Sequence, residues 1–175
     1  ELINLSGFQT DSNSQFSGEV PDCFWELPNL SSINFQHNQL TGEIPESICS
    51  LTNLSYLRLE MNQFYGEIPD CIGNLVNLTS LDLGINQFSG GIPEQICNLT
   101  NLNNLGLRVN EFEGEIPSCI GNLTNLNDLY LNRNSFSGEI PEQICNLTNL
   151  SMLKLSENQL SGFIPNCICE LSGLN

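Results

Sequence analysis

A proline every 24 residues constrains the fold of this chain more than any other feature. The series runs without a slip through Pro21, Pro45, Pro69, Pro93, Pro117, Pro141 and Pro165. Counted from each proline, leucine or an equivalent recurs at +6, +9, +12 and +14, asparagine at +17, phenylalanine or leucine at +19, glycine at +21 and isoleucine at +23. A fixed period in this range predicts a solenoid whose coils bury their apolar side chains against one another.

The repeated pattern L-x-x-L-x-x-L-x-L-x-x-N, followed by F-S-G-x-I-P, resembles the plant-type extracellular leucine-rich repeat (LRR). The resemblance covers almost the whole chain. It implies an α/β solenoid, namely a right-handed superhelix of seven 24-residue coils over residues 15–175, with a parallel sheet on the concave face. We expect the solenoid to be open at both ends, because neither end has a cysteine-bounded cap. Residues 1–14 are expected to form an irregular strand at residues 1–5 and a polar insert, Phe8 to Ser14, that joins repeats.

Each coil is predicted to contain one short strand and one short helical turn. The alternation around Leu105 and Leu107 places both leucines on one face of a strand, and Ile-Pro favours an extended entry into the turn. We interpret two columns as structural. Asparagines that satisfy the turning backbone stand at Asn38, Asn62, Asn86, Asn110, Asn134 and Asn158. A stacked apolar spine comprises Phe16, Leu40, Phe64, Phe88, Phe112, Phe136 and Leu160.

Charge and composition exclude several classes of function. The 20 acidic and four basic residues give a net charge of −16, which argues against a nucleic-acid partner because phosphate binding needs clustered lysine and arginine. No apolar run approaches the roughly 18 residues of a membrane span. The single histidine, His37, has no evident partner for acid–base chemistry. We therefore expect no enzymatic activity and no cofactor.

Two features predict a secreted or cell-surface glycoprotein. One is the presence of eight cysteines in a lysine-poor chain. The other is a set of eight N-x-S/T sequons, which are predicted glycosylation sites. They are Asn4, Asn29, Asn53, Asn77, Asn98, Asn122, Asn146 and Asn149.

The cysteines alternate between two positions of the repeat, +2 and +4. Neighbouring coils lie about 4.8 Å apart, which suits the Cα separation of a disulfide. Pairing each +4 cysteine with the next +2 cysteine predicts Cys49–Cys71, Cys97–Cys119 and Cys145–Cys167, and leaves Cys23 and Cys169 for bridges between copies. The competing scheme is Cys23–Cys49, Cys71–Cys97 and Cys119–Cys145, with Cys167 and Cys169 left two residues apart. We favour the first scheme because it accounts for every cysteine, but connectivity cannot be decided from sequence. Zinc binding is less favoured, since only Cys167 and Cys169 form a close pair.

The outward strand positions +11, +13, +15 and +16 form the predicted concave face and hold all four basic residues. Its candidate ligand-binding anchors are Tyr56, Arg58, Asp82, Arg108, Asp128, Tyr130, Arg133 and Lys154. Alternatively, these charges only balance one another along the ladder. A second column, on another flank, comprises Glu19, Glu43, Glu67, Glu115 and Glu139. We interpret it as a solvated edge that blocks lateral aggregation rather than as a calcium site.

Three functions are compatible with these patterns. The favoured hypothesis is a non-catalytic, glycosylated scaffold that stacks end to end with other copies of itself, in a longer solenoid or a fibre. It rests on the missing caps, on Cys23 and Cys169, and on a phase match that would place Leu2 of a following copy at +12. The resemblance implies the alternative: a ligand-recognition ectodomain or inhibitor, as in plant receptor kinases and polygalacturonase-inhibiting proteins. Its concave face would bind a protein, a peptide or a cell-wall polysaccharide. Ice binding is a third, weaker hypothesis, because the concave columns are mixed in size and charge.

Overall fold

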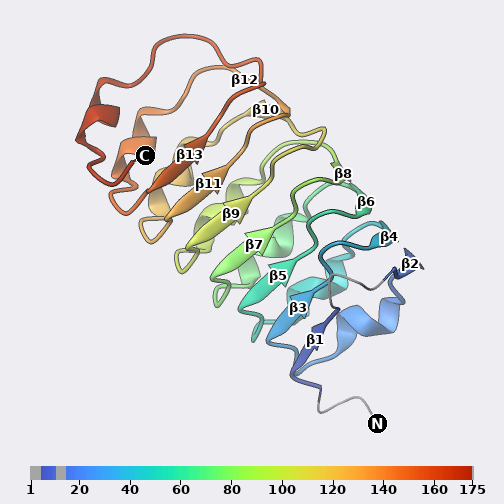
Figure 1. Cartoon of the computed structure of the whole chain (residues 1–175). Coiled ribbons are helices and arrows are strands. Elements are labelled where there is room, and N and C mark those ends of the chain that lie inside the picture. Colours follow the sequence, from blue (N-terminus) through green and yellow to red (C-terminus); the bar gives the residue numbers. More distant parts are fainter. Residues whose placement is uncertain (1–4, 11–14, 175) are drawn as a thin grey trace.

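The computed structural model describes residues 5–10 and 15–174. The chain winds into a solenoid in which each coil adds one strand beside the strand of the preceding coil, from the N-terminus in blue to the C-terminus in red (Figure 1). This is the solenoid that the 24-residue period predicts. Among the described residues, no helix is both long and apolar enough to cross a membrane.

One wall of the solenoid is a seven-stranded parallel sheet, ordered β1-β3-β5-β7-β9-β11-β13. Its strands are β1 (Gly7–Gln9), β3 (Ser32–Asn34), β5 (Tyr56–Arg58), β7 (Ser80–Asp82), β9 (Asn104–Gly106), β11 (Asp128–Tyr130) and β13 (Met152–Lys154). The central residues stay in register, as Leu57, Leu81 and Leu105 do across β5, β7 and β9. Leu57, Leu81 and Leu105 are completely buried, so the residues on either side of them face outward.

The first strand lies where the sequence predicted the polar insert. Phe8 of β1 pairs with Ile33 of β3, an offset of 25 residues, whereas Ile33 pairs with Leu57 at an offset of 24. The first coil is therefore a repeat with one extra residue. The strand predicted at residues 1–5 falls mostly outside the described residues, and Leu5 is not in a strand. Phe8 takes the +12 position of the first coil by pairing with Ile33. The predicted phase match used Leu2 at that position, and Leu2 lies outside the described residues.

A second set of short strands forms behind the bend of each coil. A four-stranded ladder comprises β2 (Ser17–Glu19), β4 (Gln39–Gly42), β6 (Gln63–Gly66) and β8 (Gln87–Phe88), and a two-stranded ladder comprises β10 (Glu113–Glu115) and β12 (Ser135–Ser137). Each proline of the 24-residue series then precedes a single 3-10 helix, which is the predicted short helical turn. These helices are η2 (Asp22–Glu26), η3 (Glu46–Ser50), η4 (Asp70–Asn74), η5 (Glu94–Asn98), η6 (Ser118–Asn122), η7 (Glu142–Asn146) and η8 (Asn166–Glu170).

The core consists of the apolar columns that the repeat predicts. Leu99, Leu102, Leu105 and Leu107 are completely buried, and each such burial is worth about 1.5–3 kcal/mol relative to exposure. The rings of Phe64, Phe88, Phe112 and Phe136 stack with centroids 6.1–6.3 Å apart. Phe16 departs from the predicted spine, since it is 53% exposed. Phe16 directly precedes β2, the edge strand of its ladder, so its ring has a neighbouring coil on one side only.

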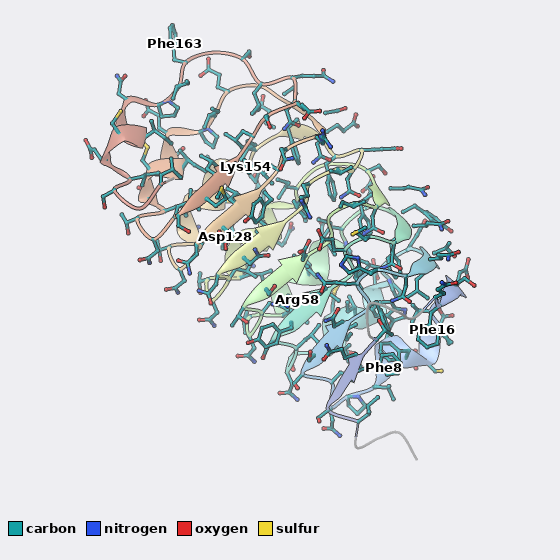
Figure 2. The ribbon with its side chains drawn as sticks, in the orientation of Figure 1. Phe8, Phe16, Arg58, Asp128, Lys154 and Phe163 are labelled. Carbon is teal, nitrogen blue, oxygen red and sulfur yellow. A yellow bond between two sulfur atoms is a disulfide. The ribbon has the colours of Figure 1, made fainter. Side chains whose placement is uncertain are left out.

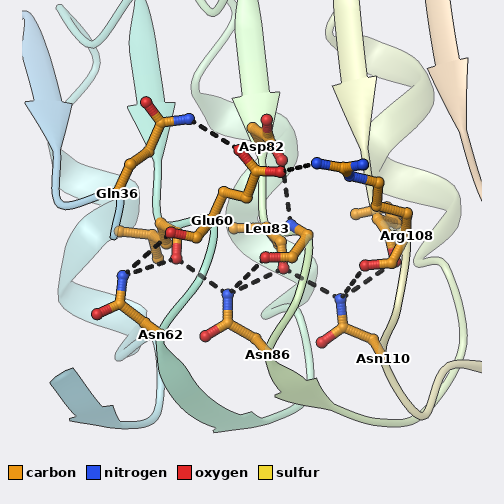
Figure 3. Close-up of polar contacts among 11 residues, drawn as sticks. Gln36, Glu60, Asn62, Asp82, Leu83, Asn86, Arg108 and Asn110 are labelled. Carbon is orange, nitrogen blue, oxygen red and sulfur yellow. Dashed lines mark hydrogen bonds and ion pairs between the residues drawn. The ribbon is translucent and has the colours of Figure 1, made fainter. Parts of the chain in front are cut away.

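The asparagine column closes each bend. The side-chain amide of Asn86 donates to the carbonyl oxygens of Leu59, Leu83 and Gly84 at 3.0–3.1 Å. Its Oδ1 accepts the backbone N–H of Phe64 at 3.0 Å. The same pattern continues along the column, as Figure 3 shows for Asn62, Asn86 and Asn110. One side chain thus satisfies the turning backbone of two coils.

Three disulfides clamp neighbouring coils together. They are Cys49–Cys71, Cys97–Cys119 and Cys145–Cys167, with Cα separations of 5.7, 5.7 and 5.8 Å. These are the pairs of the first sequence-based scheme. Cys23 and Cys169 are free and exposed in the single chain.

Candidate functional site

The solvent-facing side of the seven-stranded sheet, called the sheet face from here on, holds the predicted ligand-binding residues. In Figure 2, Arg58, Asp128 and Lys154 lie on β5, β11 and β13 of this sheet. The eight candidates come from β5, β7, β11 and β13 and from the residues just after β9 and β11. The fold therefore gathers all of them on one surface, where Arg58 is the strand partner of Asp82 and Tyr130 that of Lys154.

A carboxylate–guanidinium pair spans two coils at the centre of the sheet face. Arg108, which follows β9, forms a hydrogen-bonded ion pair with Glu60, which follows β5 (Figure 3). Gln36 donates to the other oxygen of Glu60 at 3.2 Å. Gly84 occupies the intervening position of this column, and a Cβ there would lie 3.1 Å from Cγ of Arg108. The missing side chain therefore lets Arg108 lie across the middle coil.

Asp82 lies beside this pair and is an unusual carboxylate. Burial, followed by repulsion from Glu60, raises its pKa from 3.8 to about 6. Arg108, Arg58 and the backbone N–H of Gly84, which donates at 3.1 Å, oppose that shift. A Cβ at Gly106 would lie only 2.6 Å from Oδ1 of Asp82. Two glycines thus leave room for a partly buried carboxyl group on an otherwise ordinary strand.

Aromatic and basic side chains flank the cluster. The Arg58 guanidinium lies 5.4 Å from the centre of the Tyr56 ring, and its Nε donates to Ser80 at 3.4 Å. Burial, with the Asp128 charge adding to it, raises the pKa of Tyr130. The hydrogen bond to Glu60 raises the pKa of Arg108.

The remaining candidates lie toward the C-terminal coils. Arg133 pairs with Glu157 at 2.9 Å, but both side chains are more than half exposed, and such pairs contribute little. Lys154 is exposed at the end of β13. Some of the charge-balancing contacts that the sequence suggested therefore exist. The Glu60–Arg108 contact, which spans two coils, and the partly buried carboxyl group of Asp82 go beyond charge balance.

Sequence reasoning missed one feature of the sheet face, which we call the left-handed column. It is the residue before each ladder asparagine: His37, Met61, Ile85, Val109, Arg133 and Glu157. All six have φ between 53° and 60°, a conformation that asparagine and glycine tolerate best. The sequence signal that could have indicated this conformation is the fixed position of the residue, directly before each ladder asparagine.

The glutamate column lies on another flank. Glu43, Glu67, Glu115 and Glu139 each lie against the left-handed glycine of the next coil, where a Cβ would come within 2.9 Å. Among the described residues, no three acidic, histidine or cysteine side chains gather as metal ligands do.

Of the sequons, Asn77 and Asn149 donate to backbone carbonyls of the preceding coil at 2.8 Å, and Asn4 lies outside the described residues.

A separate cavity of about 210 Å³ opens at the N-terminal end of the solenoid. Phe8, Phe16, Phe24, Phe35 and Leu40 provide most of its lining. Phe8 and Phe16 mark this end in Figure 2, opposite Phe163. The cavity has no network of charged groups comparable to that around Glu60.

Two family models match the chain. One, described as a leucine-rich repeat region, matches residues 13–129, and the other, a leucine rich repeat, matches residues 125–147 and 149–171. No curated protein matches.

Solved structures resemble the chain over nearly its whole length. The LRR ectodomain of the Arabidopsis thaliana membrane receptor kinase GASSHO1/SCHENGEN3, in complex with CASPARIAN STRIP INTEGRITY FACTOR 2, is 37% identical with a TM-score of 0.94, covering 98% of this chain and 20% of that one. The Arabidopsis receptor kinase HAESA, in complex with the peptide hormone IDA and the co-receptor SERK1, is 42% identical with a TM-score of 0.89. The match covers 93% of this chain and 27% of that one. A plant ice-binding protein is 29% identical with a TM-score of 0.73. The match covers 95% of this chain and 67% of that one.

Proposed function

Because the chain belongs to the leucine-rich repeat family, we propose that it is an extracellular ligand-recognition region that binds a peptide on its sheet face. The observation that carries this proposal is the Gln36–Glu60–Arg108 cluster beside Asp82. The asparagine ladder and the apolar columns already hold the coils together. The solenoid therefore does not need the Arg108 side chain to reach over the intervening coil to Glu60. A buried carboxylate such as Glu60, held by hydrogen bonds from Gln36 and Arg108 beside a second carboxylate, is instead typical of a functional site.

The similar ectodomain structures support a peptide as the ligand. HAESA was solved with a peptide hormone, and the GASSHO1/SCHENGEN3 ectodomain with an integrity factor. The chain spans only 20% and 27% of those two structures. We therefore propose peptide binding for the described sheet face, in preference to the scaffold that the sequence analysis favoured.

The eight candidate residues divide into three roles in this proposal. Tyr56 and Tyr130 provide aromatic surface on either side of the cluster, and Arg58, Arg108, Arg133 and Lys154 bind acidic or carbonyl groups of the ligand. Asp82 and Asp128 bind its donors. The chain acts by binding rather than by catalysis, outside the cell or at its surface, and carries N-glycans at some of its sequons.

A peptide selection tests this function. The purified, glycan-trimmed chain is immobilised and used to select from a displayed library of random 12-residue peptides at pH 7.5. We expect enriched peptides whose affinity, measured by titration calorimetry, falls at least tenfold when Arg108→Ala and Tyr130→Ala are combined. The same peptides should bind unchanged to the control Glu43→Ala, which alters the glutamate column. Failure to enrich any peptide, or equal losses in both variants, would refute the proposal.

End-to-end stacking is a second candidate function. It is favoured by Cys23 and Cys169, which are free and exposed at opposite ends of the solenoid. They occupy the +2 and +4 positions that form disulfides elsewhere in the chain. The mass of the native material after glycan removal tests it: a large species that falls to 19.4 kDa with reductant supports stacking through these cysteines, and 19.4 kDa under both conditions rejects a disulfide-linked stack.

The likeness to a plant ice-binding protein raises ice binding as well. The sheet face has no row of identical side chains that would match a lattice: the column through Arg58, Asp82 and Gly106 varies in size and charge. We therefore expect no inhibition of ice growth by the purified chain.

A further inference from the structure

Three members of the left-handed column are apolar, and we call Met61, Ile85 and Val109 the apolar ridge. Their φ values are 57°, 53° and 55°. Ile85 and Val109 are branched at Cβ, which makes the left-handed conformation especially unfavourable for them. Asparagine or glycine would fit the same backbone without that strain. Some benefit other than backbone geometry must therefore account for the apolar side chains.

Folding does not supply that benefit. His37 and Arg133 occupy the same conformation in neighbouring coils and form the same ladder hydrogen bonds, to Glu60 and Ser156 at 3.0 and 2.9 Å. The backbone of the solenoid thus accepts polar side chains at this position. The ridge also contributes no fully buried residue to the core, and Met61 is 40% exposed.

The ridge is continuous. The N–H of Met61 donates to the carbonyl of Gly84 at 3.0 Å, and the N–H of Ile85 donates to that of Arg108 at 2.8 Å. These bonds place the three ridge residues one strand spacing apart, in consecutive coils. Strain retained on a solvent-facing apolar stripe indicates a role in binding rather than in folding.

Asp82 lies three residues before Ile85 in the same coil, at most about 10 Å away along the chain. Within the described part of the chain, the only hydrogen bond to its carboxylate is from the Gly84 amide. Glu60, Arg58, Arg108 and Tyr130 are the charged or titratable groups that act on it, and Arg108 is already engaged by Glu60. The chain as a whole carries a charge of −16, a field that favours approach of a cation.

We infer that the apolar ridge and Asp82 form one subsite, which takes an aliphatic side chain on the ridge and a basic side chain on the carboxylate. This inference rests on the proposed peptide-binding function and specifies the ligand chemistry at the same surface. In an extended peptide, a span of about 10 Å corresponds to about three residues. The ligand is therefore a peptide with a basic and an aliphatic residue two to four positions apart.

The peptide selection described above provides the probes. The enriched peptides are expected to share a basic and an aliphatic residue at this spacing. Their affinities are then measured for wild type, Ile85→Asn, Val109→Asn and Asp82→Asn, with His37→Asn as the matched control, because it makes the same substitution in the same backbone conformation outside the ridge.

We expect each of the three subsite variants to weaken binding at least fivefold and His37→Asn to change it less than twofold. Ile85→Asn should also raise the thermal unfolding midpoint, because it removes strain; a rise in stability with a loss of affinity excludes misfolding as the cause. Peptides that bind all three variants within fivefold of wild type would overturn this inference and leave the proposed function standing. If no peptide is enriched, the proposed function fails and this inference fails with it.

Discussion

Asp82 shows how strongly a single residue of the sheet face responds to its surroundings. Its pKa of about 6 exceeds the ordinary value of 3.8, with burial as the main cause. Between these two values the folded chain binds more protons at this site than the unfolded chain does. The contribution of Asp82 to the free energy of unfolding therefore falls as the pH rises from about 4 to about 6.

Replacing this carboxyl group should remove that pH dependence. A shift of this size corresponds to about 3 kcal/mol, so we expect Asp82→Asn to gain that amount of stability relative to wild type between pH 4 and pH 7. Urea denaturation at several pH values measures the difference, and every other carboxyl group is common to both proteins. Parallel pH profiles for the two proteins would contradict the burial of Asp82.

The sequence predicts individual residues well where they belong to a column. Asn86 and Leu105 are found where the period places them, because every coil imposes the same environment. The Glu60–Arg108 contact was not predictable in this way, since it joins coils two apart and depends on glycine at position 84. The raised pKa of Asp82 likewise depends on neighbours from several strands.

At the scale of the element, the asparagine ladder is the feature most open to test. Asn86→Ala removes donors to three backbone carbonyls and an acceptor for a backbone N–H. Leaving these groups unsatisfied should lower the free energy of unfolding by about 3 kcal/mol. Asn158→Ala makes the same change in a terminal coil, where Leu153 and Leu155 are only partly buried, so water can replace the lost partners. Equal losses in the two variants would argue against this explanation.

The disulfides offer a second test at this scale. Each closes a segment of 22 residues, for which the chain-entropy estimate is about 3 kcal/mol. We expect the double variant Cys97→Ser, Cys119→Ser to lose about that much stability in urea denaturation. The matched variant Cys23→Ser, Cys169→Ser removes two free, exposed thiols and should change stability by less than about 0.5 kcal/mol. A larger loss of stability in the Cys23→Ser, Cys169→Ser variant would imply that the cysteines pair differently.

The elements themselves were largely predictable, with one instructive exception. Strands and short helical turns occur once per coil because the alternation and the Ile-Pro step recur once per coil. The first strand was misplaced because one additional residue between β1 and β3 changes the offset from 24 to 25. A prediction that assumes an unbroken 24-residue period therefore assigns Phe8 to an insert. In the structure Phe8 pairs with Ile33 in the seven-stranded sheet.

For the whole molecule, the contacts that stabilise the solenoid lie apart from the surface that we propose for recognition. The apolar columns, the asparagine ladder and the disulfides hold each coil to its neighbours, as in other solenoids. The sheet face carries the charges, the tyrosines and the strained ridge that this cohesion does not require. This separation is what favours ligand recognition over self-assembly as the function of the chain.

The location of a bound peptide tests this account most directly. An enriched peptide carrying a photoreactive group is cross-linked to the unmodified protein, and the attachment sites are identified by mass spectrometry. We predict that they fall within residues 56–61, 80–85, 104–109 and 128–133. Attachment concentrated on the 3-10 helices or on the glutamate column would contradict the assignment of the sheet face as the binding surface.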